Sequence, residues 1–126
     1  MRKISVILIL LLSICCYAFA TEIITAEITG TGLLQGCNSL AKALENQELT
    51  KEDYSNVLFW SGYLAGFLDT MPAAGTTFYC LPEGGLSYGQ LAMVVQKYLR
   101  NNPEFLDKEP AAIILLALGK AFPCKR

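Results

Sequence analysis

The stretch Phe59–Asp69 constrains the fold more than any other part of the chain, because a helix drawn through it carries large apolar side chains on every side. No face of such a helix can meet water without exposing several rings, so we expect a central, buried helix. Gly62 and Gly66 lie one turn apart on it, and we expect them to let a neighbouring backbone approach closely. The run is too short to span a bilayer and lies between Asp53 and Asp69, so a membrane-dimer motif is disfavoured.

The first twenty residues have the features of a secretory signal. Arg2-Lys3 gives a positive start, an apolar run follows, and Ala18-Phe19-Ala20 supplies the small residues that a signal peptidase reads. We therefore expect export and cleavage after Ala20. Lipidation at Cys15 is disfavoured because Ile14 is bulky where that peptidase needs a small residue. An uncleaved anchor over residues 4–20 is the other alternative, and the small residues at its end favour removal.

Removal of the signal leaves 106 residues, enough for one domain with one core. Eight of the ten Lys and Arg residues remain, against eleven Asp and Glu, so the formal charge becomes about −3. A chain with this charge balance has no strongly positive electrostatic potential that would attract nucleic acid or anionic lipid.

Three cysteines remain after cleavage, namely Cys37, Cys80 and Cys124. An exported protein favours a disulfide, and the odd count leaves at least one thiol unpaired within the chain. Three pairings are possible. Cys80 with Cys124 is favoured, because both lie close to a proline at the end of an apolar segment.

Apolar spacing predicts an all-α, single-domain bundle of four to five helices with one disulfide. Residues 21–32 are expected to form an extended N-terminal arm, ended by Gly30 and Gly32, and residues 33–126 the helical domain. Thr50 with Asp53, and Ser87 with Gln90, have the spacing of capping boxes. The predicted helices and the long loop are, in order, 33–46, 50–70, the loop Met71–Leu86, a helix from Ser87 to Asn101, and a helix from Pro110 towards Phe122. We expect Phe78, Tyr79 and Leu81 to hold this loop on the core.

The sequence does not point to an enzyme. It contains no histidine, the commonest general base and metal ligand, and its cysteines lack zinc-ligand spacing. We therefore expect no catalytic residue, no cofactor and no metal site, and we favour binding. Asp69, Tyr79, Glu83 and Tyr88 offer acidic and aromatic groups near the loop, and tyrosine is common at interface hot spots.

Several segments in order resemble the Rap/Tai immunity proteins of type VI secretion systems. The resemblance covers about Leu33 to Cys124, and the segments are Gly62-Tyr63-Leu64-Ala65-Gly66, Phe78-Tyr79-Cys80-Leu81-Pro82-Glu83-Gly84, Gly89-Gln90-Leu91, Val94-Val95-Gln96-Lys97-Tyr98-Leu99, Pro110-Ala111-Ala112 and Ala121-Phe122-Pro123-Cys124. It implies a small periplasmic all-helical protein, often a homodimer, that binds and blocks a secreted peptidoglycan amidase. It also implies the Cys80–Cys124 disulfide.

The mechanism implied by this resemblance is occlusion of the amidase's active site by the loop Met71–Leu86. Glu83 or a nearby carbonyl would face the catalytic groove, with Asp69, Tyr79, Gly84 and Tyr88 as further candidate contacts. Many relatives carry a second cysteine where this chain has Trp60 and Ser61, so Cys37 is either buried and reduced or available to a second chain. The alternative function is a general periplasmic helical binding or chaperone protein without a dedicated effector.

Overall fold

The computed structural model describes residues 28–71 and 78–124. These residues form four α-helices and one 3-10 helix, with no strand among them, so the all-α prediction is confirmed. The elements are α2 (Gly30–Leu44), α3 (Lys51–Thr70), α4 (Tyr88–Asn101), η1 (Pro103–Phe105) and α5 (Pro110–Ala121). The predicted signal segment and most of the predicted arm lie outside the described residues, as do residues 72–77 of the predicted loop.

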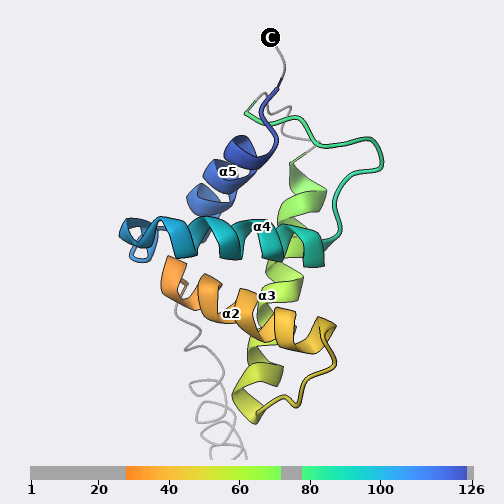
Figure 1. The fold of residues 1–126 in the computed structure, drawn as a ribbon, viewed down its shortest axis with the longest axis vertical. Helices are drawn as coiled ribbons and strands as arrows, with labels where there is room; N and C mark the ends of the chain where they lie inside the picture. Colours follow the sequence, from red (N-terminus) through yellow and green to blue (C-terminus); the bar gives the residue numbers. More distant parts are fainter. Residues whose placement is uncertain (1–27, 72–77, 125–126) are drawn as a thin grey trace, which may run out of the picture.

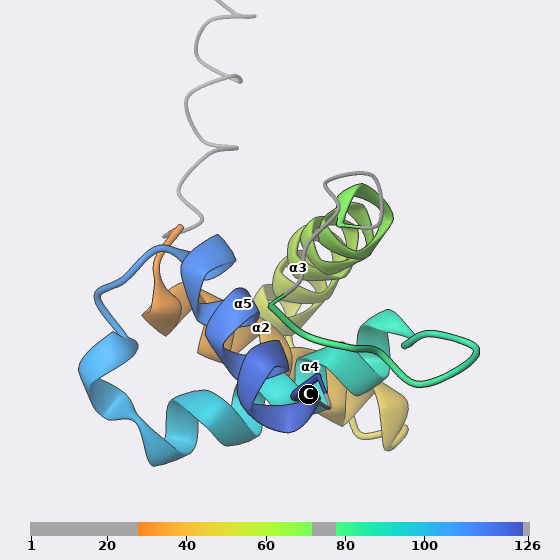
Figure 2. The ribbon, with the colours of Figure 1, turned by 90° about the horizontal axis from the view of Figure 1, so that it is seen from above.

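The helices α2 and α4 form the centre of the fold. They lie side by side, α3 crosses behind both, and α5 packs on α4 from the opposite side to α2 (Figure 1). Each of α2 and α4 contacts the other three helices, whereas α3 packs mainly on α2 and α4. Seen from above, α3 projects beyond the other helices (Figure 2).

One hydrophobic core joins all four helices, and the spacing of its residues explains why they form helices. Buried residues recur at three- and four-residue intervals, which places them on one face of each helix. The core consists of Leu33, Cys37 and Leu40 from α2, Trp60 and Leu64 from α3, Leu91, Ala92, Val95 and Leu99 from α4, Ile113, Ile114, Ala117 and Leu118 from α5, and Tyr79 from the segment before α4.

The prediction that the helix through Phe59–Asp69 is buried on every side is wrong, because Phe59 is 39% exposed and Asp69 is also exposed. Just before this stretch, Leu58 is 75% exposed and Tyr54 is exposed too. Gly62 and Gly66 face open space, with no atom within 4 Å of where a Cβ would stand. One exposed stripe along α3, which we call the α3 face, consists of Tyr54, Leu58, Phe59, Gly62 and Gly66. It is exposed because partner helices cover only the side of α3 that carries Trp60 and Leu64.

Close helix packing occurs instead at Gly36 of α2. A Cβ on Gly36 would stand 2.7 Å from Trp60 Cβ and would overlap the indole ring. Trp60 is fully buried, and its ring packs edge-on against Phe59 and Tyr63 at centroid distances of 5.0 and 5.4 Å. The missing side chain at Gly36 therefore provides the space that α3's largest residue fills.

The first described helix begins earlier than its apolar stripe predicts. Helix α2 starts at Gly30, with Thr29 as N-cap, rather than near Leu33. Its first turn is held from outside, because the backbone N–H of Gly30 donates to Lys108 O at 2.9 Å and that of Thr31 to Leu106 O at 2.8 Å. The site where a Gly30 Cβ would stand is occupied by Phe105 O, so glycine is required there for packing and does not break the helix.

Both predicted capping boxes are present. Thr50 Oγ1 accepts from the Asp53 N–H at 3.1 Å while the Asp53 carboxylate accepts from the Thr50 N–H at 3.0 Å. Ser87 and Gln90 make the equivalent pair at the start of α4, at 3.2 and 2.9 Å. Local side-chain chemistry therefore sets the first residue of α3 and of α4.

Asp53 also links α2 to α3. Its buried carboxylate accepts hydrogen bonds from Ser39 Oγ at 2.7 Å and from Lys42 Nζ at 2.9 and 3.0 Å, both on α2, as well as from Thr50. The Ser39 hydroxyl, then Lys42 and Thr50, lower the pKa of the Asp53 carboxyl well below its usual range, because each stabilises the charged form.

This pKa shift predicts a pH-dependent contribution to stability. Because the pKa in the folded protein lies below the unfolded value of about 3.9, the contribution is complete above about pH 4 and is lost as pH falls towards the folded pKa. Asp53→Asn is expected to unfold at lower urea concentration at pH 7 and to lose less stability than wild type between pH 7 and pH 3. Asp69→Asn, at an exposed position, is the control and should follow wild type. If wild type and Asp53→Asn lose the same stability between pH 7 and pH 3, the Asp53 carboxylate is not the source of the pH dependence.

No helix in residues 28–71 or 78–124 combines the length and the hydropathy needed to cross a membrane.

Candidate functional site

The segment Phe78–Leu86, the described part of the predicted loop, is fixed to the end of α5. Cys80 forms a disulfide with Cys124, the pairing favoured by the sequence and implied by the family resemblance. The N–H of Cys80 donates to Phe122 O at 2.9 Å, and the Tyr79 ring is buried in the core. A covalent bond, a backbone hydrogen bond and a buried ring therefore anchor the beginning of the segment.

The other end of the segment is fixed by the start of α4. Leu86 packs partly buried against the core, and Ser87 is the N-cap of α4. Gly89 lies close to Leu44 of α2, since a Cβ at Gly89 would stand 3.1 Å from Leu44 Cδ1. The chain therefore leaves and re-enters the helical body at two fixed points.

Between these points lies an exposed turn, which we call the loop tip and define as Pro82–Gly85. All four residues are exposed, and the turn closes with a hydrogen bond from Gly85 N–H to Pro82 O at 3.0 Å. Gly84 and Gly85 have φ of +91° and +75°, in the left-handed region that favours glycine. The tip extends away from the helices in two perpendicular views (Figures 1 and 2). It can therefore enter a concave surface on a partner.

The residues proposed from the sequence as partner contacts do not all reach the surface. Glu83 and Gly84 are exposed on the loop tip, Tyr88 is 46% exposed in the first turn of α4, and Asp69 is exposed in the last turn of α3. Tyr79 is only 7% exposed, and its hydroxyl has no hydrogen-bond partner among the described residues. Tyr79 thus supports the loop from inside the core, and we omit it from the contact set proposed below.

Phe78 differs from its expected position. It was expected to hold the loop on the core together with Tyr79 and Leu81, but its side chain is 73% exposed. Only its backbone packs, with its carbonyl 3.3 Å from where a Cβ on Gly119 would stand. Tyr79 and Leu81 do pack on the core, as expected. Residues on alternate sides of an extended segment point in opposite directions, so Phe78 and Tyr79 cannot both be buried by the same helices.

Two surface features were missed from the sequence. One is the α3 face, and the other is a cleft between α4 and α5 that is lined by Lys97 and Lys120. Neither feature has a sequence motif, because each depends on which helices pack against one another. The signal that could have indicated the cleft is compositional, since α4 and α5 contain basic residues but no Asp or Glu.

Cys37 is buried and reduced. It is 1% exposed, and burial raises its pKa to about 12, so the thiol is neutral at any physiological pH. The alternative in which Cys37 bonds to a second chain is wrong for this fold, because the sulfur has no access to the surface.

Among the described residues, no group of three or more His, Cys, Asp or Glu side chains is arranged to hold a metal ion. Those residues instead form a small disulfide-bonded helical domain with one exposed, doubly anchored loop tip, the features of a binding protein.

A family model of Rap1a immunity proteins matches residues 29–124, and the chain belongs to that family. Searches of curated proteins and of solved structures each gave no match. Family membership makes this chain an immunity protein for a secreted effector. Proteins of this family generally act as non-enzymatic inhibitors and are typically periplasmic.

Proposed function

We propose that this protein is exported to the periplasm, with cleavage after Ala20, and there binds and blocks a peptidoglycan amidase injected by a type VI secretion system. Membership in the Rap1a family supports the immunity role, and the Rap/Tai resemblance supports the amidase as the effector. The observation that carries the mechanism is the loop tip, which is exposed at its end and anchored on both sides.

Anchoring matters because an inhibitor must hold its contact surface in the bound conformation. A free loop loses conformational entropy when it binds, whereas a loop already fixed at Cys80 and Ser87 has lost most of that freedom on folding. The tip carries one charge, that of Glu83. An acidic group complements a groove in which the catalytic Cys and His pair includes a cationic or proton-donating group, and opposite charges speed association.

The contact surface we propose consists of Glu83 and Gly84 on the tip, with Tyr88 next to it and Asp69 at the end of α3. The end of α3 and the loop lie at the same end of the molecule (Figure 1). Tyr88 is the aromatic residue best placed to act as a hot spot, because it is half exposed and lies one residue after the N-cap that fixes the loop.

Charge reversal at Glu83 tests this mechanism. We expect Glu83→Lys to weaken binding to the cognate peptidoglycan amidase at least tenfold, measured by isothermal titration calorimetry. We also expect the amidase to hydrolyse peptidoglycan in the presence of this variant. Glu48→Lys is the matched control, because it reverses the charge of another exposed glutamate, in the α2–α3 connection, and should bind as wild type. Unchanged affinity for Glu83→Lys, combined with unchanged affinity after removal of Gly84 and Gly85, would exclude the loop as the inhibitory element.

We also propose that the protein is a homodimer that associates through the α3 face. Leu58 and Phe59 expose large apolar groups there, and Gly62 and Gly66 leave a shallow strip on which a second helix can lie closely. Light scattering of wild type and of Leu58→Glu measures the molecular mass of each in solution. A wild-type mass equal to one chain would refute the homodimer. The same apolar surface would suit the alternative of a general binding or chaperone protein, which predicts many weak clients in place of one tightly bound amidase.

A further inference from the structure

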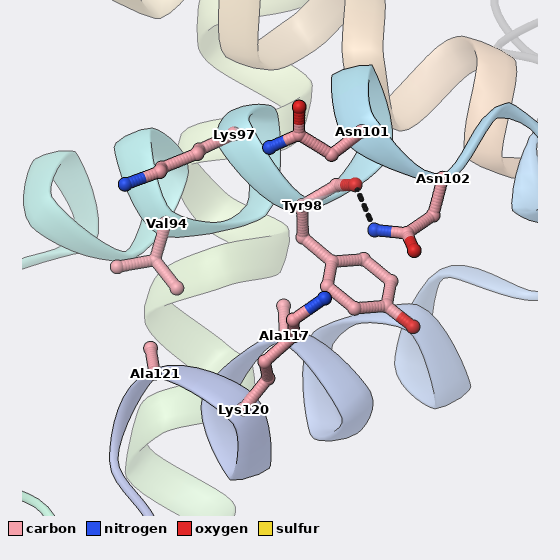
Figure 3. Close-up of a pocket in the computed structure, with 8 residues that line it drawn as sticks. All are labelled: Val94, Lys97, Tyr98, Asn101, Asn102, Ala117, Lys120 and Ala121. Carbon is pink, nitrogen blue, oxygen red and sulfur yellow. Dashed lines mark hydrogen bonds between the residues drawn. The ribbon is translucent and has the colours of Figure 1, made fainter.

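The cleft between α4 and α5 has a volume of about 380 Å³ (Figure 3). Val94, Ala117 and Ala121 form its apolar part, and the polar groups of Lys97, Asn101, Asn102 and Lys120 surround it, with the Tyr98 ring at one side. Cavities that bind small groups have this combination of apolar lining and a few polar groups. The volume is sufficient for one or two side chains of a bound peptide.

Both lysines in the cleft are available to a ligand. Neither has an ion-pair partner among the described residues, whereas Lys42 and Lys108 are paired with Asp53 and Asp107. Lys120 Nζ lies 5.8 Å from the centroid of the Tyr98 ring, at the outer limit of a cation–π contact that holds the ammonium at the cleft. Figure 3 shows this ammonium beside the ring, between the two helices.

The charge of this region is opposite to that of the whole chain. Helices α4 and α5 contain Lys97, Arg100 and Lys120 and no acidic residue, while the whole chain has a formal charge of −1. Arg100 does not line the cleft, since its guanidinium donates to Asn38 on α2 at 3.1 Å. The acidic residues of the α4–α5 connection, Glu104, Asp107 and Glu109, do not line it either.

The carboxamides add hydrogen-bonding capacity of the same kind. Asn102 Nδ2 donates to Tyr98 O at 2.7 Å, and this bond fixes the Asn102 side chain at the edge of the cleft. Asn101 also lines the cleft and is exposed, so its amide group adds a further hydrogen-bond donor there. Two ammonium groups and an amide donor favour a ligand that accepts hydrogen bonds and carries negative charge.

The cleft is also next to the proposed effector-binding loop. Ala121, part of the apolar lining, is followed directly by Phe122, whose carbonyl accepts from the Cys80 N–H, and by Cys124, which is bonded to Cys80. The end of α5 therefore borders both the cleft and the loop. A protein partner of ordinary interface size, about 800 Å² on each side, is large enough to cover both.

We propose that this cleft is a second binding site, which takes an acidic side chain together with an adjacent small apolar group from a peptide segment of the effector. This inference depends on the proposed function for the identity of the partner but not for the chemistry of the cleft. The carboxylate lies between Lys97 and Lys120, and the apolar group contacts Val94 and Ala117.

The chemistry is tested by NMR titration of isotope-labelled protein with the peptide acetyl-Ala-Glu-Ala-amide, with acetyl-Ala-Gln-Ala-amide as the neutral control. We expect saturable shifts in residues 94–121 with the acidic peptide only, and their loss in Lys97→Gln/Lys120→Gln. Lys97→Arg/Lys120→Arg should retain them. The matched control Lys51→Gln/Lys108→Gln removes the same two charges elsewhere and should bind as wild type. Equal shifts with both peptides, or shifts unaffected by loss of the cleft lysines, overturn the proposal.

The partner is tested with the same variants and the amidase. Lys97→Gln/Lys120→Gln is expected to weaken amidase binding about tenfold relative to Lys51→Gln/Lys108→Gln. Unchanged affinity in a protein that still responds to Glu83→Lys overturns the assignment of the cleft to the effector and leaves the loop mechanism intact. If wild type does not bind the amidase at all, the proposed function fails, and with it the identity of the cleft's partner.

Discussion

Replacing Cys80 and Cys124 together by alanine is expected to lower the free energy of unfolding by about 4 kcal/mol, which is the chain-entropy value for a bond joining residues 44 apart. For a domain of this size that is a large share of the usual 5–15 kcal/mol. The loss should appear as a lower midpoint in urea unfolding. Both positions lie at least partly at the surface, so alanine leaves no buried cavity to add to the loss.

The same change should also disturb the loop. Cys80 is one of the points that fix Phe78–Leu86, so its loss frees one end of the loop tip and should weaken amidase binding more than it alters helix content. Reductant added to wild type should reproduce both effects and should leave the double variant unchanged, because the remaining Cys37 is buried and reduced. A count of free thiols shows when the reductant has broken the disulfide. If the reduced wild type still unfolds at the same urea midpoint, the disulfide is not a source of stability.

The second large effect is a contrast between glycines in neighbouring helices. Gly36→Ala is expected to destabilise the fold by about 2 kcal/mol, because the added methyl group overlaps the ring and lies against Cβ of the buried Trp60, and Cβ cannot rotate away. Gly66→Ala is expected to stabilise the fold of a single chain by about 0.5–1 kcal/mol, measured in the Leu58→Glu background that keeps the α3 face unpaired. Alanine has the higher helix propensity and meets no atom of its own chain within 4 Å.

Urea unfolding of the two variants measures this contrast, and a double-mutant cycle assigns its cause. Trp60→Leu alone should be destabilising, but Gly36→Ala should cost less in that background, since the ring it overlaps is gone. Shifts of the same sign and size for Gly36→Ala and Gly66→Ala would show that backbone propensity, and not contact with Trp60, controls both positions.

Features that depend on neighbouring residues could be predicted from the sequence. Thr50 with Asp53 and Ser87 with Gln90 set the starts of α3 and α4 through hydrogen bonds three residues apart, and Pro110 begins α5 as expected. The exposed tip at Glu83-Gly84-Gly85 follows from glycines that tolerate positive φ. The Cys80–Cys124 pairing was one of three open possibilities, favoured by nearby prolines and by the family resemblance.

Features that depend on contacts between distant segments were decided only by the tertiary structure. The glycines of the Phe59–Asp69 stretch looked like packing sites, yet the close approach occurs at Gly36, because packing depends on which helix supplies the facing ring. In the same way, α2 begins at Gly30 because Lys108 O accepts from the Gly30 N–H and Leu106 O accepts from the Thr31 N–H. The sequence alone determined where α3, α4 and α5 begin and what chemistry each helix can offer. Which of their faces meet, and so which side chains stay exposed to bind a partner, depended on long-range packing that no local pattern encodes.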